Sequence, residues 1–263
     1  MSARIPIPIG RAIRLPQAWS HFPAIPPPVD VPLTTLPPQP CPYFEDRLAR
    51  LRAIQAYRIE PEAYHQFMDA GFRRSGRMLY QPVCTGCRDC RQLRVPVADF
   101  CMSRSQRRCW RRNQTLMVSV ASPRPTCEKY DLYRRYLAER HDGKQEDSRA
   151  AFEAFLYESP VRSVEFEYRL PPDGRLLAVG ICDESPRSLS SVYFYFEPSE
   201  ARRGLGTFGA LREIAYAGQR GIPYYYLGYW VAGAPTMDYK ASFRPYELLD
   251  GDGAYRRREG PSA

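Results

Sequence analysis

Hydrophobic spacing separates a proline-rich beginning from a mixed region that follows it. The first forty residues contain eleven prolines, and their few apolar residues follow neither a helical nor a strand period. This composition predicts a disordered or polyproline-type arm over residues 1–40. Farther along, the spacing predicts, in order, a helix over 61–70, strands over 80–84 and 93–97, and a helix capped by Ser103 that runs to about Leu116.

The second half predicts helices followed by a strand meander. Its pattern indicates helices over 127–141 and 148–157, strands over 163–170, 176–182 and 189–196, a helix over 205–220 and an aromatic strand over 224–230. Antiparallel strands, a glycine turn into a helix and one more strand follow the order of the GNAT-like acyltransferase fold. We therefore predict an α+β protein with a mixed, mainly antiparallel sheet. Its predicted parts are a small cysteine- and arginine-rich domain over 41–125, a GNAT-like domain over 126–250 and a flexible tail over 251–263.

Composition and the start of the chain limit the class of protein. The 263 residues are 44% hydrophobic and 25% charged, which is typical of a folded globular protein and excludes a fibrous or wholly disordered chain. No apolar stretch approaches the roughly 18 residues of a membrane span, and the N-terminus lacks the apolar core of a secretory signal. We expect a cytoplasmic protein without a membrane partner; its oligomeric state stays open.

Positive charge is concentrated in one segment. The net charge is +9, and residues 71–112 contain eleven arginines against Asp89 and Asp99, while the rest of the chain is balanced. This distribution indicates a nucleic-acid or other anionic partner. The predicted phosphate-binding helix face consists of Arg104, Arg107, Arg108 and Arg111. The alternative is chance clustering on a solvated face, in a chain with only three lysines.

Four of the eight cysteines form a candidate metal site. Cys84, Cys87 and Cys90 have the C-x-x-C-x-x-C spacing, and three thiolates in one turn can bind zinc or an iron–sulfur cluster. Cys41 is the expected fourth ligand, and Cys101 is the reserve candidate. The alternative is a set of reduced structural cysteines without metal.

Two segments of the second half are candidate binding elements. Gly206 and Thr207 begin a predicted helix whose first N–H groups can bind an anion, although the same glycines can simply cap the helix. The aromatic strand and the segment after it predict the lining of a pocket, against the alternative of aromatic core packing. The catalytic candidates there are Tyr229, Asp238 and Lys240.

These motifs, taken in order, resemble those of one enzyme family. They are Cys41-Pro42-Tyr43, Gly71-Phe72-Arg73-Arg74-Ser75-Gly76, the cysteine motif with Tyr80 and Pro82, Ser103 to Arg108, Leu132-Tyr133-x-Arg135-Tyr136 with Arg140-His141, Leu205-Gly206-Thr207, Tyr226 to Trp230, and Met237-x-Tyr239-Lys240-x-x-Phe243-x-Pro245. The chain resembles the aminoacyl-tRNA–protein transferases of the N-degron pathway. Within that family it is similar to the bacterial aspartate/glutamate leucyltransferases.

The resemblance implies transfer of leucine from leucyl-tRNA to the α-amine of proteins that begin with Asp or Glu, which tags them for degradation. It implies no cofactor for the transfer itself. An arginyl donor, a coenzyme-A-dependent N-acetyltransferase and a non-catalytic zinc-dependent nucleic-acid-binding module stay open as alternatives.

An acidic acceptor needs a cationic, fork-shaped partner. We expect at least one of Arg73 and Arg74, together with Lys240, to line the acceptor site. Tyr229 and Asp238 are expected to orient the attacking amine. The full set of substrate-binding candidates is Arg73, Arg74, Arg244, Gly206 and Thr207.

Overall fold

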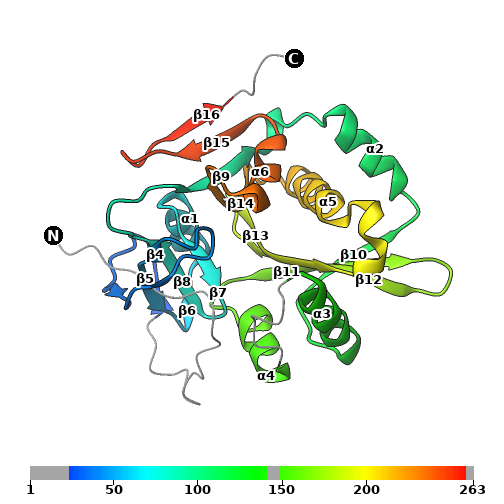
Figure 1. Ribbon diagram of the computed structural model, residues 1–263, viewed down its shortest axis with the longest axis horizontal. Helices are drawn as coiled ribbons and strands as arrows, with labels where there is room; N and C mark the ends of the chain where they lie inside the picture. Colours follow the sequence, from blue (N-terminus) through cyan, green and yellow to red (C-terminus); the bar gives the residue numbers. More distant parts are fainter. Residues whose placement is uncertain (1–23, 141–147, 259–263) are drawn as a thin grey trace.

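The computed structural model describes residues 24–140 and 148–258; the predicted His141 motif lies outside them. The described residues form a large sheet, a small sheet and two further two-stranded pairs (Figure 1). The strands are β1 (Ala24–Ile25), β2 (Thr34–Thr35), β3 (Gln39–Pro40), β4 (Leu48–Ala49), β5 (Leu51–Gln55), β6 (Arg58–Ile59), β7 (Arg73–Ser75), β8 (Met78–Pro82), β9 (Cys90–Pro96), β10 (Met117–Ala121), β11 (Ser163–Leu170), β12 (Arg175–Glu184), β13 (Ser188–Phe196), β14 (Tyr224–Val231), β15 (Tyr246–Leu249) and β16 (Tyr255–Arg258). The α-helices are α1 (Pro61–Asp69), α2 (Arg104–Arg112), α3 (Cys127–Arg140), α4 (Arg149–Phe152), α5 (Leu205–Gln219) and α6 (Pro235–Asp238). Shorter helical turns are η2 (Val97–Asp99), the π-helical η3 (Glu153–Tyr157), η4 (Pro198–Arg203) and η5 (Tyr239–Ser242).

The large sheet has eight strands in the order β10-β11-β12-β13-β14-β9-β15-β16. Every neighbouring pair is antiparallel except β13 and β14, which are parallel and are connected through α5. Helix α5 covers one face of the sheet, and α3 and α4 cover the other (Figure 1). This arrangement confirms the predicted α+β class with a mixed, mainly antiparallel sheet.

The parallel pair separates soon after it forms. Only Ser188–Ser190 of β13 pair with Tyr224–Tyr226 of β14. A bulge between Tyr226 and Gly228 then shifts β14 against β9, and Gly228 has a φ of 85°. Backbone groups of β13 beyond Ser190 therefore lack a β14 partner.

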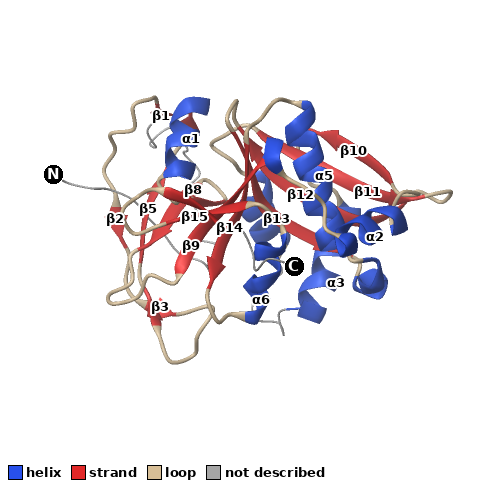
Figure 2. Ribbon diagram, turned by 90° about the horizontal axis from the view of Figure 1, so that it is seen from above, coloured by secondary structure: helices blue, strands red, loops and turns tan. Residues whose placement is uncertain are grey.

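The small sheet, β2-β5-β8-β7, lies at one end of the large sheet beside α1 (Figure 2). Helix α1 begins at Pro61 and is followed by Gly71 with a φ of 84°, as its proline start and glycine end predict. The buried side of α1 packs against Ile54 and Phe72. This packing sets the end of α1 and the start of β7 close to β13.

Near both ends of the described ranges, the structure has strands where the sequence predicted a disordered or polyproline-type arm and a flexible tail. In the predicted arm, residues 24–40 are ordered: Ile25 is buried, and β2 pairs with β5. Val29, Val31 and Leu33 are partly buried at alternating positions against the cluster that contains Ile25. In the predicted flexible tail, β16 pairs with β15. The structure also adds β9 and β10, from the predicted N-terminal domain, to the large sheet.

Within the described ranges, none of the helices has the length and apolar character that crossing a membrane requires.

Candidate functional site

The separation of β13 and β14 forms the centre of the candidate site, and Arg73 reaches into it from β7. The Arg73 side chain donates from Nη1 to Ser190 Oγ at 2.8 Å and from Nη2 to the Ser191 carbonyl. A Cβ atom on Gly228 would lie 3.0 Å from the guanidinium. The bulge glycine therefore leaves the space that Arg73 occupies. Ends of parallel strands that separate in this way are common ligand sites.

Lys240, in η5, is the second cation of the site. Its Nζ donates to the Tyr229 carbonyl at 2.7 Å, and the side chain is buried. Burial, with a smaller effect of the Arg73 guanidinium, lowers the pKa of Lys240 to about 7. Arg73 and Lys240 come from distant segments, yet Arg73 lies near enough to disfavour the charge of Lys240.

No carboxylate among the described residues forms an ion pair with Arg73 or Lys240. Arg73 is 8% exposed and Lys240 is 7% exposed, so both have lost most of their water. Buried charges are ordinarily paired, because an unpaired one costs several kcal/mol. An anionic ligand would supply the missing charge.

Glu213 of α5 is the buried acid of this region, and sequence reasoning missed it. The carboxyl group is 1% exposed, and Oε2 accepts a hydrogen bond from the Tyr225 hydroxyl. Burial raises the pKa of Glu213 to about 7, while Tyr225, Cys182 and Ser191 favour the ionised form. The sequence does contain one signal for Glu213: it is a glutamate on the apolar face of a predicted helix, between Ala210 and Ala217. We call Arg73, Lys240, Ser190, Ser191 and Glu213 the divergence site.

Arg74 follows Arg73 in sequence but is used differently. Its Nε lies 2.6 Å from Asp183 Oδ2, and both side chains are fully buried. Tyr64 and Ser163 also donate to this carboxylate. The charge of Arg74 is neutralised within the fold, which leaves Arg73 as the unpaired member of the predicted arginine pair.

The other candidates of the C-terminal segment have separate locations. The Tyr229 hydroxyl is buried and donates to the Gly71 carbonyl at 2.9 Å. The contact of Tyr229 with Lys240 is therefore made by its backbone carbonyl and not by its side chain. Asp238 is exposed at the end of α6. Arg244 is exposed, and its Nε donates to Ala241 O at 3.2 Å. Of the predicted residues, the structure brings Arg73, Lys240 and the Tyr229 backbone together.

The predicted arginine helix has the predicted start and an exposed basic surface. Ser103 and Gln106 form a reciprocal capping box at the start of α2. The α2 arginine surface, as we name it, consists of five exposed arginines: Arg104, Arg107, Arg108, Arg111 and Arg112. None of the five pairs with a carboxylate of the described residues. Trp110, also on α2, packs against Phe208 of α5, with ring centroids 5.5 Å apart.

The end of α2 contacts the turn that begins α5. Cys109 Sγ donates to Gly204 O at 3.3 Å, and Asn113 Nδ2 donates to Arg203 O at 2.9 Å. Gly206 and Thr207, both partly exposed, follow this turn in the first turn of α5. The predicted anion-binding turn and the α2 arginine surface are therefore neighbours.

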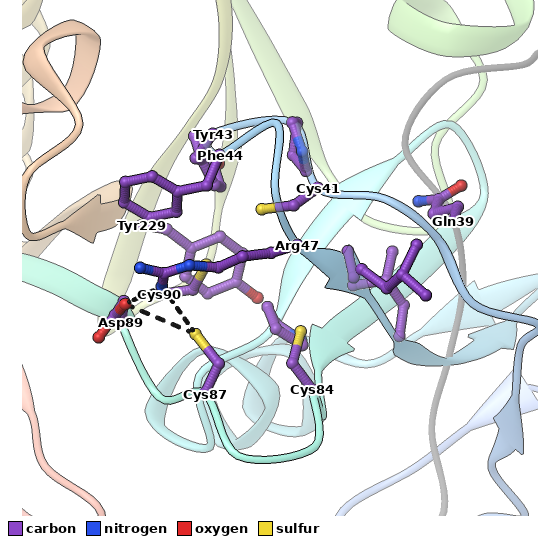
Figure 3. A pocket seen from close by; sticks show the side chains of 15 residues that line it. Gln39, Cys41, Tyr43, Phe44, Arg47, Cys84, Cys87, Asp89, Cys90 and Tyr229 are labelled. Carbon is purple, nitrogen blue, oxygen red and sulfur yellow. Dashed lines mark hydrogen bonds and ion pairs between the residues drawn. The ribbon is translucent and has the colours of Figure 1, made fainter.

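The four predicted metal ligands line one pocket (Figure 3). We call it the cysteine pocket; it is lined by Cys41, Cys84, Cys87 and Cys90, with Arg47, Asp89, Tyr43, Phe44 and Tyr229 among the other residues. Burial, with smaller effects of the other cysteines, raises the pKa of Cys90 to about 12. Arg47 Nη1 lies 2.6 Å from Asp89 and 3.7 Å from Cys87 Sγ. Cys101 is exposed and is not part of this lining.

The thiols fit a metal by chemistry but not by their arrangement. Thiolates are the ligands that zinc and iron–sulfur clusters prefer. However, no group of three or more His, Cys, Asp or Glu side chains within 24–140 and 148–258 is arranged to hold a metal ion. We therefore derive no chemical step from a metal.

Sequence comparisons place this geometry in a family context. The family models described as "Arginine-tRNA-protein transferase, N terminus" and "Arginine-tRNA-protein transferase, C terminus" match residues 39–108 and 128–250. An aspartate/glutamate leucyltransferase of Halorhodospira halophila is 42% identical over 216 residues, which is 81% of this chain and 92% of that protein. Another, of Acinetobacter baumannii, is 43% identical over 225 residues, which is 84% of this chain and 82% of that protein.

Similar solved structures include FemX, at 11% identity and a TM-score of 0.42 over 66% of this chain and 63% of that one. The L-PGS structure from Bacillus licheniformis has 13% identity and a TM-score of 0.42, over 66% of this chain and 51% of that one. These structural likenesses are too low to carry a functional argument. The sequence matches, in contrast, confirm the resemblance drawn from the motifs: the chain belongs to the aspartate/glutamate leucyltransferase family.

Proposed function

We propose that this protein transfers leucine from leucyl-tRNA to the α-amine of proteins whose first residue is aspartate or glutamate, tagging them for degradation. The observation that carries the proposal is the pair of buried cations without a carboxylate partner, Arg73 and Lys240, in a member of this family. An acidic first residue supplies the charge that they lack. Because aminoacyl-tRNA is a cytoplasmic substrate, the proposal includes the cytoplasm as the location.

The acceptor carboxylate is proposed to bind between Arg73 and Lys240. Two N–H groups of Arg73 already point into the separation of β13 and β14, bound to Ser190 and Ser191. A carboxylate that binds beside Lys240 would raise the pKa of its ammonium and keep it charged. Asparagine and glutamine would lack this charge, which supports selection of acidic residues.

The tRNA is proposed to bind along the α2 arginine surface and toward the start of α5. The arginines are exposed and unpaired with carboxylates of the described residues, as polyphosphate binding requires. Gly206 and Thr207 lie next to the end of α2 and would receive the terminal nucleotides. This path connects the phosphate-binding surface to the sheet that contains the divergence site.

The proposed chemistry is aminolysis of an ester that is already activated. The neutral α-amine attacks the leucyl carbonyl carbon, a C–N bond forms, and the C–O bond to the terminal ribose breaks. The amine loses one proton and the ribose oxygen gains one. Positioning and electrostatic stabilisation of the oxyanion supply the rate, so the proposal requires no cofactor. Asp238, exposed two residues from Lys240, stays a proposed contact of the attacking amine.

An arginyl donor is the second candidate, because both matching family models are described as arginine-tRNA-protein transferases. Arg73 and Lys240 disfavour it, since a cationic donor side chain near two unpaired cations would be repelled.

The test supplies leucyl-, arginyl- and phenylalanyl-tRNA in parallel with peptides that begin with Asp, Glu, Asn, Arg or Ala. Leucine incorporation into the Asp and Glu peptides alone is expected. Equal labelling of the Ala peptide, or arginine as the preferred donor, would contradict the proposal. Metal analysis of protein purified without air separately tests the cysteine pocket, and full transfer in excess chelator is expected.

A further inference from the structure

Glu213 is a buried acid that neither proposed binding surface requires. Its Oε2 accepts from Tyr225, whereas Oε1, also buried, accepts no hydrogen bond from the described residues. A buried carboxylate oxygen without a well-directed donor is costly, because it has lost water. The Cys182 thiol and the Ser191 hydroxyl, which favour the ionised form of Glu213, are donors close to this carboxyl group. A structural acid would be expected to have both oxygens satisfied.

Two glycines maintain the position of this carboxyl group. A Cβ on Gly180 of β12 would lie 2.6 Å from Glu213 Oε1 and 3.0 Å from the Phe194 ring. A Cβ on Gly209 of α5 would lie 2.1 Å from the same ring. The missing side chains thus create the room in which the carboxyl group and Phe194 lie side by side.

Ser191 connects Glu213 to the separation of β13 and β14. Its hydroxyl is near the carboxyl group and favours its ionised form, while its carbonyl accepts from Arg73. Ser191 is partly exposed, whereas Glu213 is not. The serine is therefore the outer member of a short polar path that ends at the buried acid.

The other ionisable groups around Glu213 do not change charge near neutral pH, apart from Lys240. Burial raises the pKa of Tyr225, Tyr168 and Cys182 well above the usual range. The pKa of Tyr239, whose side chain is half exposed, is also raised, by partial burial and in part by Tyr136 and Glu213. The cations that act on this cluster are Arg73 of β7, near Cys182 and Tyr239, and Arg212 of α5, near Tyr168. In the acceptor complex, a bound carboxylate keeps Lys240 protonated, which leaves Glu213 as the acid able to take a proton.

Resting on the proposed leucyl transfer, we infer that Glu213 accepts the proton that the acceptor's α-amine loses, with the Ser191 hydroxyl passing it inward. As the C–N bond forms, the amine proton moves to Ser191 Oγ and the hydroxyl proton of Ser191 moves to Glu213. As the ester C–O bond breaks, the proton returns by the same path to the terminal ribose oxygen. Glu213 and Ser191 end unchanged, so the step balances without another reactant.

The test compares Glu213→Gln and Ser191→Ala with the wild-type protein, using saturating leucyl-tRNA and an Asp-starting peptide from pH 5.5 to 9. Glutamine keeps an oxygen for the Tyr225 hydroxyl but accepts no proton. Glu184→Gln is the matched control, since Glu184 of β12 is a buried acid that accepts at 2.6 Å from the hydroxyl of Tyr216, which lies one turn along α5 from Glu213. Thermal unfolding of each variant is measured in parallel.

Wild-type kcat should rise with pH through about 7, because Glu213 must be ionised to accept a proton. Glu213→Gln should lower kcat by roughly 10²-fold, leave both KM values unchanged, and move the rising limb toward about 8, the range of a free α-amine. Ser191→Ala should shift the limb in the same direction with a smaller loss, and Glu184→Gln should match the wild type.

An unchanged rising limb in Glu213→Gln, or a kcat like that of the Glu184→Gln control, would overturn the inference. If Glu213→Gln fails to fold, the test depends on Ser191→Ala. A pH profile of kcat for Ser191→Ala that matches the wild type would contradict the proton path. Failure of the wild-type protein to transfer leucine would instead contradict the proposed function.

Discussion

The α2 arginine surface and the divergence site both present positive charge without a carboxylate partner among the described residues, but they are built in opposite ways. The α2 arginines are exposed and come from nine consecutive residues. Arg73 and Lys240 are buried and come from β7 and η5, far apart in the sequence. Exposed cations keep their water and suit a mobile, salt-sensitive polyphosphate contact. Buried cations have lost theirs, so a ligand that restores the charge balance is bound selectively.

The largest effect is predicted for the stability of a variant at Arg74, the neighbour of Arg73 that pairs with Asp183. Arg74→Ala leaves Asp183 buried without its cation and should lower the free energy of unfolding by about 3–5 kcal/mol. Chemical denaturation measures this change. Arg58→Ala, which breaks an exposed 3.0 Å pair with Glu60, is the control and should cost less than about 1 kcal/mol. Equal effects of the two substitutions would contradict the structural assignment of Arg74.

Arg73→Gln tests the unpaired member of the same arginine pair. It should lower kcat/KM for an Asp-starting peptide by about 10²-fold, because the acceptor carboxylate loses a charged partner. The KM for leucyl-tRNA should change by less than about twofold, since phosphate binding is assigned to α2. Steady-state kinetics with each substrate varied in turn gives both values. Loss of tRNA binding with normal peptide handling would reassign Arg73 to the nucleic-acid surface.

On the exposed side of the comparison, Arg104→Ala combined with Arg108→Ala should weaken leucyl-tRNA binding by about tenfold and reduce its log–log salt slope by about 2. Binding is measured at several salt concentrations, with Arg256→Ala, an exposed arginine of β16, as the control. An unchanged slope would return α2 to a solvated basic face.

The smallest predicted effect is the pH dependence of acceptor binding. As pH rises through about 7, the ammonium of Lys240 in the free enzyme loses its proton, and KM for the Asp peptide should rise. Titration of a group with a pKa of about 7 gives roughly a fivefold rise between pH 7 and 8. Lys240→Arg should remove the rise, because arginine stays charged. The same pH dependence in both proteins would contradict this role.

The two regions also differ in how well the sequence predicts them. Helix α2 was predictable because its signals are local: Ser103 and Gln106 form the cap, and arginine spacing defines the surface. The succession of strands β11, β12 and β13, helix α5 and strand β14 along the chain was predictable for the same reason. Neither the early strand pairing near Ile25 nor the inclusion of β9 in the large sheet has a periodic signal, since both depend on contacts between distant segments.

The divergence site was only partly predictable. Arg73 and Arg74 are adjacent and chemically identical, and only the position of Asp183 on β12 distinguishes them. Two local signals were nevertheless present, a glycine within the aromatic strand and a glutamate on the apolar face of α5. The first marks the bulge at Gly228 beside Arg73, and the second marks Glu213. Polar or glycine residues that interrupt an apolar pattern indicated the site better than the aromatic residues around them did.

In the proposed function, Arg73 and Lys240 select the acceptor through its carboxylate. The most direct test is the ratio of kcat/KM for two peptides that differ only in their first residue, Asp or Asn, measured in the wild type and in a variant carrying Arg73→Gln and Lys240→Met. We expect a wild-type ratio above about 10² and a ratio near 1 in the variant, with leucyl-tRNA binding retained. A variant that still prefers Asp as strongly as the wild type would show that another part of the molecule recognises the carboxylate.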